Sequence, residues 1–220
     1  MIHLNVPAGK ALPTTHTIKQ GEHLSEIALA NGFIQIAPIW NHTANAELKK
    51  KRKHPHVLFP GDKVVVPDKQ VKTASGATEK RHRFQAKREY LVLRLVLQDS
   101  QGEPFADKDC SLLVDLERHE LTTDGDGKIE LPITAMSKTG VLTIWNLEIP
   151  LKIGHLDPVT EPSGQKARLN NLGYYAGEQD QNDENLFKSA VEEFQCEHEL
   201  KVDGKCGPNT QQKLEAVYGY

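Results

Sequence analysis

The chain has 220 residues, of which 38% are hydrophobic and only 6% are aromatic. One continuous core in a chain of this length needs more apolar side chains, so several small domains with modest cores are favoured. The formal net charge of −3 gives no reason to expect a polyanion such as nucleic acid as the partner of the whole chain.

Charge is distributed unevenly along the chain. Residues 1–89 hold 15 Lys and Arg against 7 Asp and Glu, a formal charge of +8, and the remaining residues hold 12 against 23, a formal charge of −11. This asymmetry favours separate domains with different surroundings. No stretch approaches the roughly 20 apolar residues of a membrane span, so we expect no membrane insertion.

The N-terminal sequence and the cysteines bear on where the chain is made. MIHLNVPAGKALPTT has no charged segment followed by an apolar run, so we expect no secretory signal. The sparse, odd set Cys110, Cys196 and Cys206 is typical of a chain made in the cytoplasm. Cys196 and Cys206 flank one short loop, so they either form a disulfide after export or remain two small free side chains.

Residues 1–14 are predicted to form an extended arm, because prolines and a glycine interrupt regular structure there. A compact module is predicted over residues 15–68. Residues 15–19 alternate as a half-buried strand does, and apolar positions at helical spacing follow over residues 24–30 and 34–40. A turn at residues 60–62 leads into a closing strand at residues 64–66.

The module resembles a LysM domain, the small βααβ unit that binds N-acetylglucosamine-containing glycans such as peptidoglycan. The matching pieces are the segment 21–24 after the first strand, Asn41 after the second helix, and LFPGD at residues 58–62. The resemblance implies glycan contacts from two loops. The residues implied are Gly21, Glu22, His23 and Leu24 in the first loop and Leu58, Phe59, Pro60 and Gly61 in the second.

An insertion at residues 42–57 separates this module from the usual LysM pattern. It carries the basic run KKKRK at residues 49–53, which either binds phosphates of a wall polymer or lipid or is a solvated helix end. His54 and His56 flank Pro55, which holds the local chain extended. No cysteine or carboxylate cluster stands nearby, so we expect no metal site.

Residues 69–89 are polar and basic, with Ser-Gly near their centre, and are predicted to be an extended linker. Residues 90–153 then carry β-rich segments separated by turn signals, which predicts a small antiparallel β-sandwich. Strands are expected at residues 90–97, 111–116, 128–131 and 141–145. The pattern LQDSQGEPFADKDCSLLV with LTTDGDGKIELPI resembles transthyretin-like domains, and it makes residues 124–127 a hairpin turn rather than a calcium loop, because Lys128 stands where an EF-hand needs a ligand.

Residues 154–220 are predicted to be helical. Ala167, Leu169, Leu172 and Tyr175 share one face and Gly173 can end that helix; Leu186, Ala190, Val191 and Phe194 form a second stripe; Thr210 is expected to cap a third helix that carries Leu214 and Val217. This region resembles the three-helix peptidoglycan-binding-like domain, through the opening at residues 165–175, VEEFQ at residues 191–195, and the LKVDG and GPNT segments. The chain is therefore expected to be an α+β multidomain protein.

We expect no enzyme and no cofactor. Cys196 and His198 are two residues apart, so they point away from each other on a helix, and no HExxH motif is present. Every segment is already assigned to a module without catalytic residues.

Two functions remain open. In the first, the chain binds peptidoglycan at two points; Asn171, Tyr174 and Tyr175 are then the candidate contacts in the last module, and two weak sites gain from effective concentration. In the second, it is a structural adaptor that binds a spike, baseplate or effector protein. The module combination resembles type VI secretion spike-associated proteins, which implies export from the cytoplasm to the periplasm or a target cell by a contractile injection machine.

Overall fold

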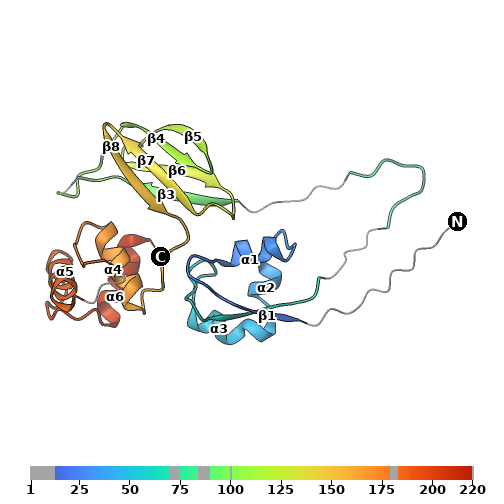
Figure 1. Ribbon diagram of the computed structural model, residues 1–220, viewed down its shortest axis with the longest axis horizontal. Coiled ribbons are helices and arrows are strands. Elements are labelled where there is room, and N and C mark those ends of the chain that lie inside the picture. The colour runs from blue at the N-terminus through green and yellow to red at the C-terminus, as the bar shows by residue number, and fades with distance from the viewer. Residues whose placement is uncertain (1–12, 70–74, 84–89, 100, 179–182, 220) are drawn as a thin grey trace.

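The computed structural model describes residues 13–69, 75–83, 90–99, 101–178 and 183–219 (Figure 1). Almost all of the predicted N-terminal arm therefore lies outside the described residues. Three separate hydrophobic cores follow one another along the chain, built around residues 18–66, 91–153 and 159–214. We refer to the three units as the first module, the sandwich and the C-terminal module.

The first module has the predicted order of strand, two helices and strand. The elements are β1 (Thr14–Thr17), α1 (Leu24–Ala30), α2 (Ala37–Trp40) and β2 (Lys63–Val66). β1 and β2 pair antiparallel, with Thr14 opposite Val66 and Thr17 opposite Lys63. The apolar residues that predicted the helices, including Leu24, Ile27, Ile39 and Trp40, are buried together beneath the two strands.

The insertion folds instead of forming a long loop. It contains the 3-10 turn η1 (Thr43–Asn45) and helix α3 (Ala46–Lys51). The buried side chain of Asn45 holds this segment to β2, because its Nδ2 donates to Val65 O at 2.8 Å and its Oδ1 accepts from Val65 N at 2.8 Å. The two bonds satisfy an edge of β2 that would otherwise expose unpaired backbone groups.

The sandwich packs a two-stranded sheet against a four-stranded sheet. The strands are β3 (Leu91–Val96), β4 (Asp109–Val114), β5 (Glu117–Thr122), β6 (Lys128–Ile133), β7 (Thr139–Ile144) and β8 (Leu147–Lys152). β3 pairs with β6, and the larger sheet has the order β5-β4-β7-β8 with all neighbours antiparallel. A turn is present at residues 124–127, since Asp124 Oδ1 accepts from Lys128 N at 2.8 Å and Gly127 has a φ of +73°. The prediction of a hairpin was wrong, because β5 and β6 on either side of this turn belong to different sheets.

Two strands of the sandwich, β5 and β8, were missed, and the strands expected at residues 111–116 and 141–145 were each placed about two residues too late. β5 and β8 are the edges of their sheet, where charged residues and proline are tolerated. β5 has Leu121 as its only large apolar residue, and β8 alternates apolar residues but is interrupted by Pro150. Leu116 was predicted to lie in a strand. It instead follows Asp115 in a two-residue hairpin turn, both residues have a positive φ, and Leu116 is 98% exposed.

The C-terminal module consists of α4 (Pro162–Asn171), α5 (Glu184–Glu197) and α6 (Pro208–Tyr218). Gly173, with a φ of +96°, follows the end of α4 as predicted. The predicted start of the third helix was wrong by several residues: α6 begins at Pro208 after Gly207, and Thr210 lies inside the first turn. Pro208 supplies the fixed φ that suits a first helical position.

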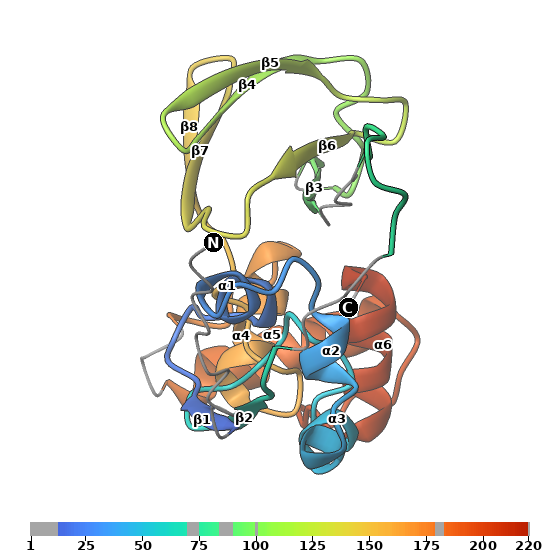
Figure 2. The ribbon, with the colours of Figure 1, turned by 90° about the vertical axis from the view of Figure 1, so that its right-hand side faces the viewer.

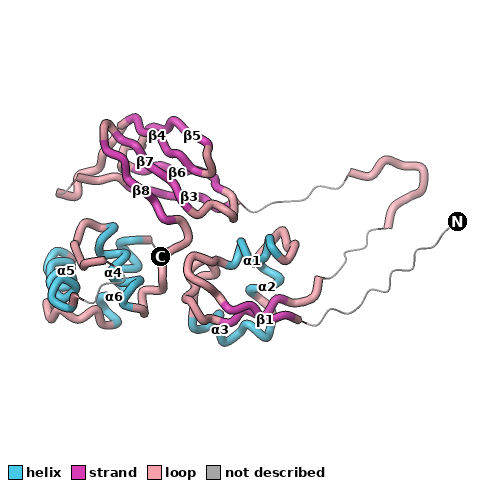
Figure 3. Tube along the Cα trace, viewed as in Figure 1, coloured by secondary structure: helices cyan, strands magenta, loops and turns pink. Residues whose placement is uncertain are grey.

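The sandwich lies on one side of both helical modules (Figure 2). Strands are confined almost entirely to the sandwich and to the β1–β2 pair, and helices to the first and C-terminal modules (Figure 3). The first and C-terminal modules are therefore neighbours in space, although the sandwich separates them in the sequence. No helix among the described residues is long and apolar enough to cross a membrane.

Candidate functional site

A buried glutamine organises the C-terminal module. Gln195, near the end of α5, accepts at Oε1 from Asp203 N at 2.9 Å and from Gly204 N at 3.0 Å. Its Nε2 lies 3.0 Å from Asp203 Oδ1, 3.1 Å from Lys205 O and 3.0 Å from Thr210 Oγ1. The amide thereby fixes the loop that joins α5 to α6. Hydrogen bonds from Gln195 and then from Lys205 N hold the pKa of Asp203 below its usual value.

The other end of the module is fixed by Arg168. This side chain is buried in α4, and its Nη1 donates to Asp157 O at 2.7 Å and to Gly164 O at 2.9 Å. Its guanidinium stacks on the ring of Tyr218, with 5.6 Å between Cζ and the ring centroid. Burial lowers the pKa of Arg168, against the opposing effects of Tyr218 and Glu215. Arg168 and Gln195 thus act in the core and loop scaffold, roles that the sequence motifs did not assign to them.

The three candidate contacts in this module differ in position. Tyr174 was expected to be exposed, but its ring is only 8% exposed, packs edge-on against Phe194 at 5.5 Å, and its hydroxyl donates to Glu197 Oε2 at 2.6 Å. Tyr175 was assigned both to the apolar helix face and to the exposed candidate contacts. It follows α4 and is 62% exposed, so the helix-face position was wrong and the expected exposure is confirmed. The positive φ of Gly173 turns the chain there, and Tyr174 takes the core position.

The exposed Asn171 and Tyr175 remain available as contacts. Asn171 Nδ2 donates to the hydroxyl of Tyr218 at 2.9 Å, so the end of α4 is tied to the end of α6. Tyr218 is half-buried over Arg168. The end of α4 therefore presents the exposed ring of Tyr175 and, close to it in sequence, the amide of Asn171, which is held by the phenol of Tyr218 in α6. Such groups suit a ligand with apolar faces and hydroxyl groups.

The two loops predicted in the first module are largely buried. His23, Leu24 and Leu58 lie in the interior, while Glu22, Phe59 and Pro60 are half-buried and Gly61 is exposed. Glu22 accepts from His16 Nε2 at 2.7 Å. Burial raises the pKa of Glu22, but the hydrogen bonds from His16 and from Lys19 N outweigh this effect and lower it. The two loops meet in space, since Gly61 N donates to Ile18 O at 2.9 Å.

The first of these loops is covered by other parts of the chain. Lys138, between β6 and β7, donates from Nζ to Gly21 O at 2.7 Å and pairs with Glu26. The ring of His155 lies over Gly21 so closely that a Cβ added to Gly21 would be 2.8 Å from it. We call the contacts of Lys138, Gly154 and His155 with residues 21–26 the sandwich junction.

The basic run of the insertion contacts the C-terminal module. The side chain of Arg52 is 2% exposed; its Nε donates to Asp62 Oδ2 at 2.8 Å and its Nη1 to Glu161 Oε1 at 3.1 Å. Lys53 pairs with Glu215 of α6 at 3.8 Å. We call the contacts of Arg52 and Lys53 with the last module the helical junction. Lys49, Lys50 and Lys51 bind Asn41, Glu47 and Asp62 respectively, so each cation of the run has a partner within the chain.

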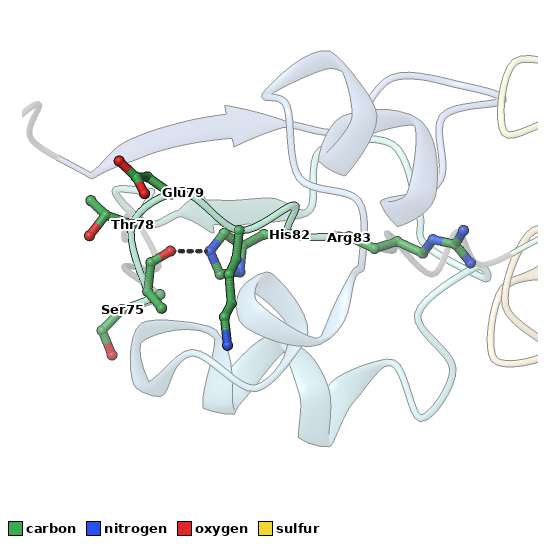
Figure 4. A pocket seen from close by; sticks show the side chains of 8 residues that line it. Ser75, Thr78, Glu79, His82 and Arg83 are labelled. Atoms are coloured by element: carbon green, nitrogen blue, oxygen red, sulfur yellow. Dashed lines mark hydrogen bonds between the residues drawn. The ribbon is translucent and has the colours of Figure 1, made fainter.

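We next consider metal ligands, the thiols and the pocket of Figure 4 as other candidate sites. Within the described ranges, no group of three or more His, Cys, Asp or Glu side chains is arranged to hold a metal ion. Cys196 and Cys206 are free thiols in this structure, and burial raises the pKa of the Cys206 thiol to about 11. The pocket in Figure 4 is lined only by residues of the 75–83 segment, where His82 contacts the backbone of Ala77. This segment forms no helix or strand.

Comparison with known families bears on the last module. Residues 165–214 match the family model described as "Putative peptidoglycan binding domain". The match runs from Gln165 of α4 to Leu214 of α6 and so covers all of α5 and most of α4 and α6, including Gln195 and Arg168. Searches of curated proteins and of solved structures returned no match.

Proposed function

We propose that this chain is a non-catalytic peptidoglycan-binding protein whose C-terminal module makes the contact. The observation that carries the proposal is the family match over residues 165–214, which coincides with a complete three-helix core. The exposed ring of Tyr175 and the amide of Asn171 supply the aromatic and polar groups that a sugar-containing polymer needs.

Sedimentation with insoluble peptidoglycan tests this proposal. The intact chain should pellet with the polymer, and the doubly substituted Tyr175→Ala, Asn171→Ala chain should stay in the supernatant. Tyr90→Ala is the matched control, because Tyr90 is an exposed tyrosine on the sandwich. If the intact chain remains soluble while a known wall-binding domain sediments, the proposal is wrong.

A second candidate function is that of an adaptor that binds protein through its first module. The observation that favours it is the sandwich junction: the loop predicted to bind sugar contacts Lys138 and His155 of the same chain. In this function the chain is made in the cytoplasm and delivered by a type VI secretion or related contractile machine. Co-purification with a spike protein, and loss of its export when the contractile apparatus is inactivated, are the expected results. Export that does not depend on that apparatus contradicts the delivery step.

A further inference from the structure

A buried histidine lies at the sandwich junction without hydrogen bonds. His23 is 3% exposed, and neither of its ring nitrogens has a hydrogen-bond partner among the described residues. A neutral imidazole carries one donor and one acceptor, so both are left unsatisfied. Buried unsatisfied groups cost stability and are rare, and they call for a physical explanation.

The groups around His23 come from four parts of the chain. Within its own module, Glu26 of α1 lies one turn further on, and the ring of His56 is 5.8 Å away and edge-on, with His54 a further 5.4 Å from His56. From the sandwich, Lys138 reaches Gly21 and Glu26.

From the segment after β8, Gly154 lies against the His23 ring, and a Cβ there would be 3.2 Å from His23 Cδ2. His155 follows and lies over Gly21. His23 therefore lies between the ring of His56 on one side and, on the other, the sandwich junction, where the ammonium of Lys138 pairs with Glu26.

A proton on this cluster is unfavourable in the closed arrangement. Burial lowers the pKa of His23 and the charge of Lys138 lowers it further, while Glu26 opposes them. Burial, followed by the neighbouring His23 and His54, lowers the pKa of His56 to about 4. A charged His23 would sit in a buried position beside an ammonium and without an acceptor for either N–H.

We propose that the sandwich junction is an acid-released contact: protonation of His23 and His56 separates Lys138 and the 153–155 segment from the first module and uncovers residues 21–24. The inference goes beyond peptidoglycan binding, because it concerns how the modules are held rather than what they bind. It also explains the unsatisfied imidazole, since a hydrogen-bond acceptor at His23 would stabilise the protonated form and abolish the response.

The direction with pH follows from the lowered pKa values. In the closed state the pKa values of His23 and His56 are both below the ordinary value of 6.5. The closed state is therefore most stable relative to the open state above about pH 6.5, and it loses stability as the pH falls below that value. Each titrating ring raises the ratio of open to closed chains by at most about tenfold per pH unit. We expect the helical junction to remain over this range, because it is formed by Arg52 with Glu161 and by Lys53 with Glu215, rather than by the imidazoles of His23 and His56. We therefore expect the first module to separate from the sandwich while it keeps its contacts with the C-terminal module.

Amide hydrogen exchange of the intact chain tests this, at about pH 7 and about pH 5 after correction for the intrinsic exchange rate. Peptides covering residues 20–27 should lose protection at the lower pH, whereas the amide of Ile153 should keep it, because Ile153 N donates to Lys138 O at 2.8 Å and both residues move away from the first module together. Peptides from α5 should keep their protection. Unchanged protection at residues 20–27, or an equal loss in α5, overturns the proposal.

Variants separate the histidine from other acid effects. His23→Leu removes the titrating ring and should abolish most of the acid-induced loss of protection, whereas the exposed-site control His82→Leu should retain it in full. If circular dichroism shows that His23→Leu is unfolded, His23→Gln provides a neutral replacement for the same measurement. An acid response of wild-type size in a folded His23 variant contradicts the proposal.

Discussion

The guanidinium of Arg52 contacts the carboxylate of Glu161 across 109 residues of sequence, with 3.1 Å between Nη1 and Oε1. The same guanidinium donates to Asp62 of its own module. A side chain from the basic insertion therefore joins the first and C-terminal modules, and it does so in a position almost fully withdrawn from water.

Replacing Arg52 should destabilise the first module. Arg52→Met leaves the buried Asp62 carboxylate without its main partner, so we expect a loss of about 3 kcal/mol in the free energy of unfolding. Unfolding followed through the buried Trp40, by fluorescence in urea, measures the loss. Lys50→Met is the matched control, since the Lys50–Glu47 pair is exposed and should contribute less than about 0.5 kcal/mol. Equal effects of the two substitutions would contradict the role given to Arg52.

Replacing Gln195 should loosen the loop between α5 and α6. Gln195→Met keeps the length of the side chain but leaves the amides of Asp203 and Gly204 without an acceptor, at a cost of about 2 kcal/mol. That cost corresponds to a roughly thirtyfold fall in hydrogen-exchange protection at the end of α5, including Leu200 N. Gln212→Met, at an exposed position of α6, should change protection little. Wild-type protection in Gln195→Met would show that the loop between α5 and α6 is ordered without the hydrogen bonds of Gln195.

The thiols should differ in reactivity under native conditions. Cys196 is exposed, whereas burial raises the pKa of Cys206 from 9.0 to about 11 against the opposing charge of Arg168. The thiolate fraction of Cys206 at neutral pH is then about a hundredfold below that of an ordinary thiol, and the thiolate is the reacting form. Iodoacetamide labelling with mass spectrometry should modify Cys196 first, and denatured chain should label at both positions alike. Rapid native labelling of Cys206 would contradict its burial.

Tyr175 should contribute to polymer binding by direct contact, and Tyr174 should not. Tyr175→Ala removes an exposed ring and should weaken peptidoglycan binding about tenfold, equivalent to about 1.4 kcal/mol, without a change in thermal stability. Tyr174→Phe removes only the hydroxyl bonded to Glu197, so it should lower stability by about 1 kcal/mol and leave binding intact. Titration with soluble peptidoglycan fragments, alongside thermal unfolding, distinguishes the two effects. The opposite pattern would place the contact elsewhere.

Local patterns predicted most of the elements. The apolar spacing of residues 24–40 and 186–194 predicted helices, and all four strands expected between residues 90 and 145 were placed within about two residues of their observed positions. β5 was missed because Leu121 is its only large apolar residue, and β8 was missed because Pro150 interrupts it; both are edge strands, where charge and proline are tolerated. Leu116 was wrongly predicted to lie in a strand, because a bulky apolar residue rarely takes a positive φ. The hairpin turn requires that conformation here.

Contacts between modules could not be predicted in this way. Lys138 and Gly21 are 117 residues apart, and no periodicity in either segment indicates that they meet. The basic run was interpreted as a solvent-exposed or anion-binding segment, because its partners Glu161 and Glu215 lie in another module. Burial of Tyr174 and exposure of Tyr175 likewise depend on how the chain leaves α4 rather than on the residue types.

The helical junction changes how the order of the modules is best understood. The first and C-terminal modules contact each other through Arg52 and Lys53. The chain leaves the first module after residue 69, forms the sandwich, and enters the C-terminal module after β8 (Figure 1). In topological terms the sandwich is equivalent to a domain inserted between two modules that contact each other. A chain in which a short flexible bridge replaces residues 70–153 would lose the sandwich junction and should still hold its two ends together.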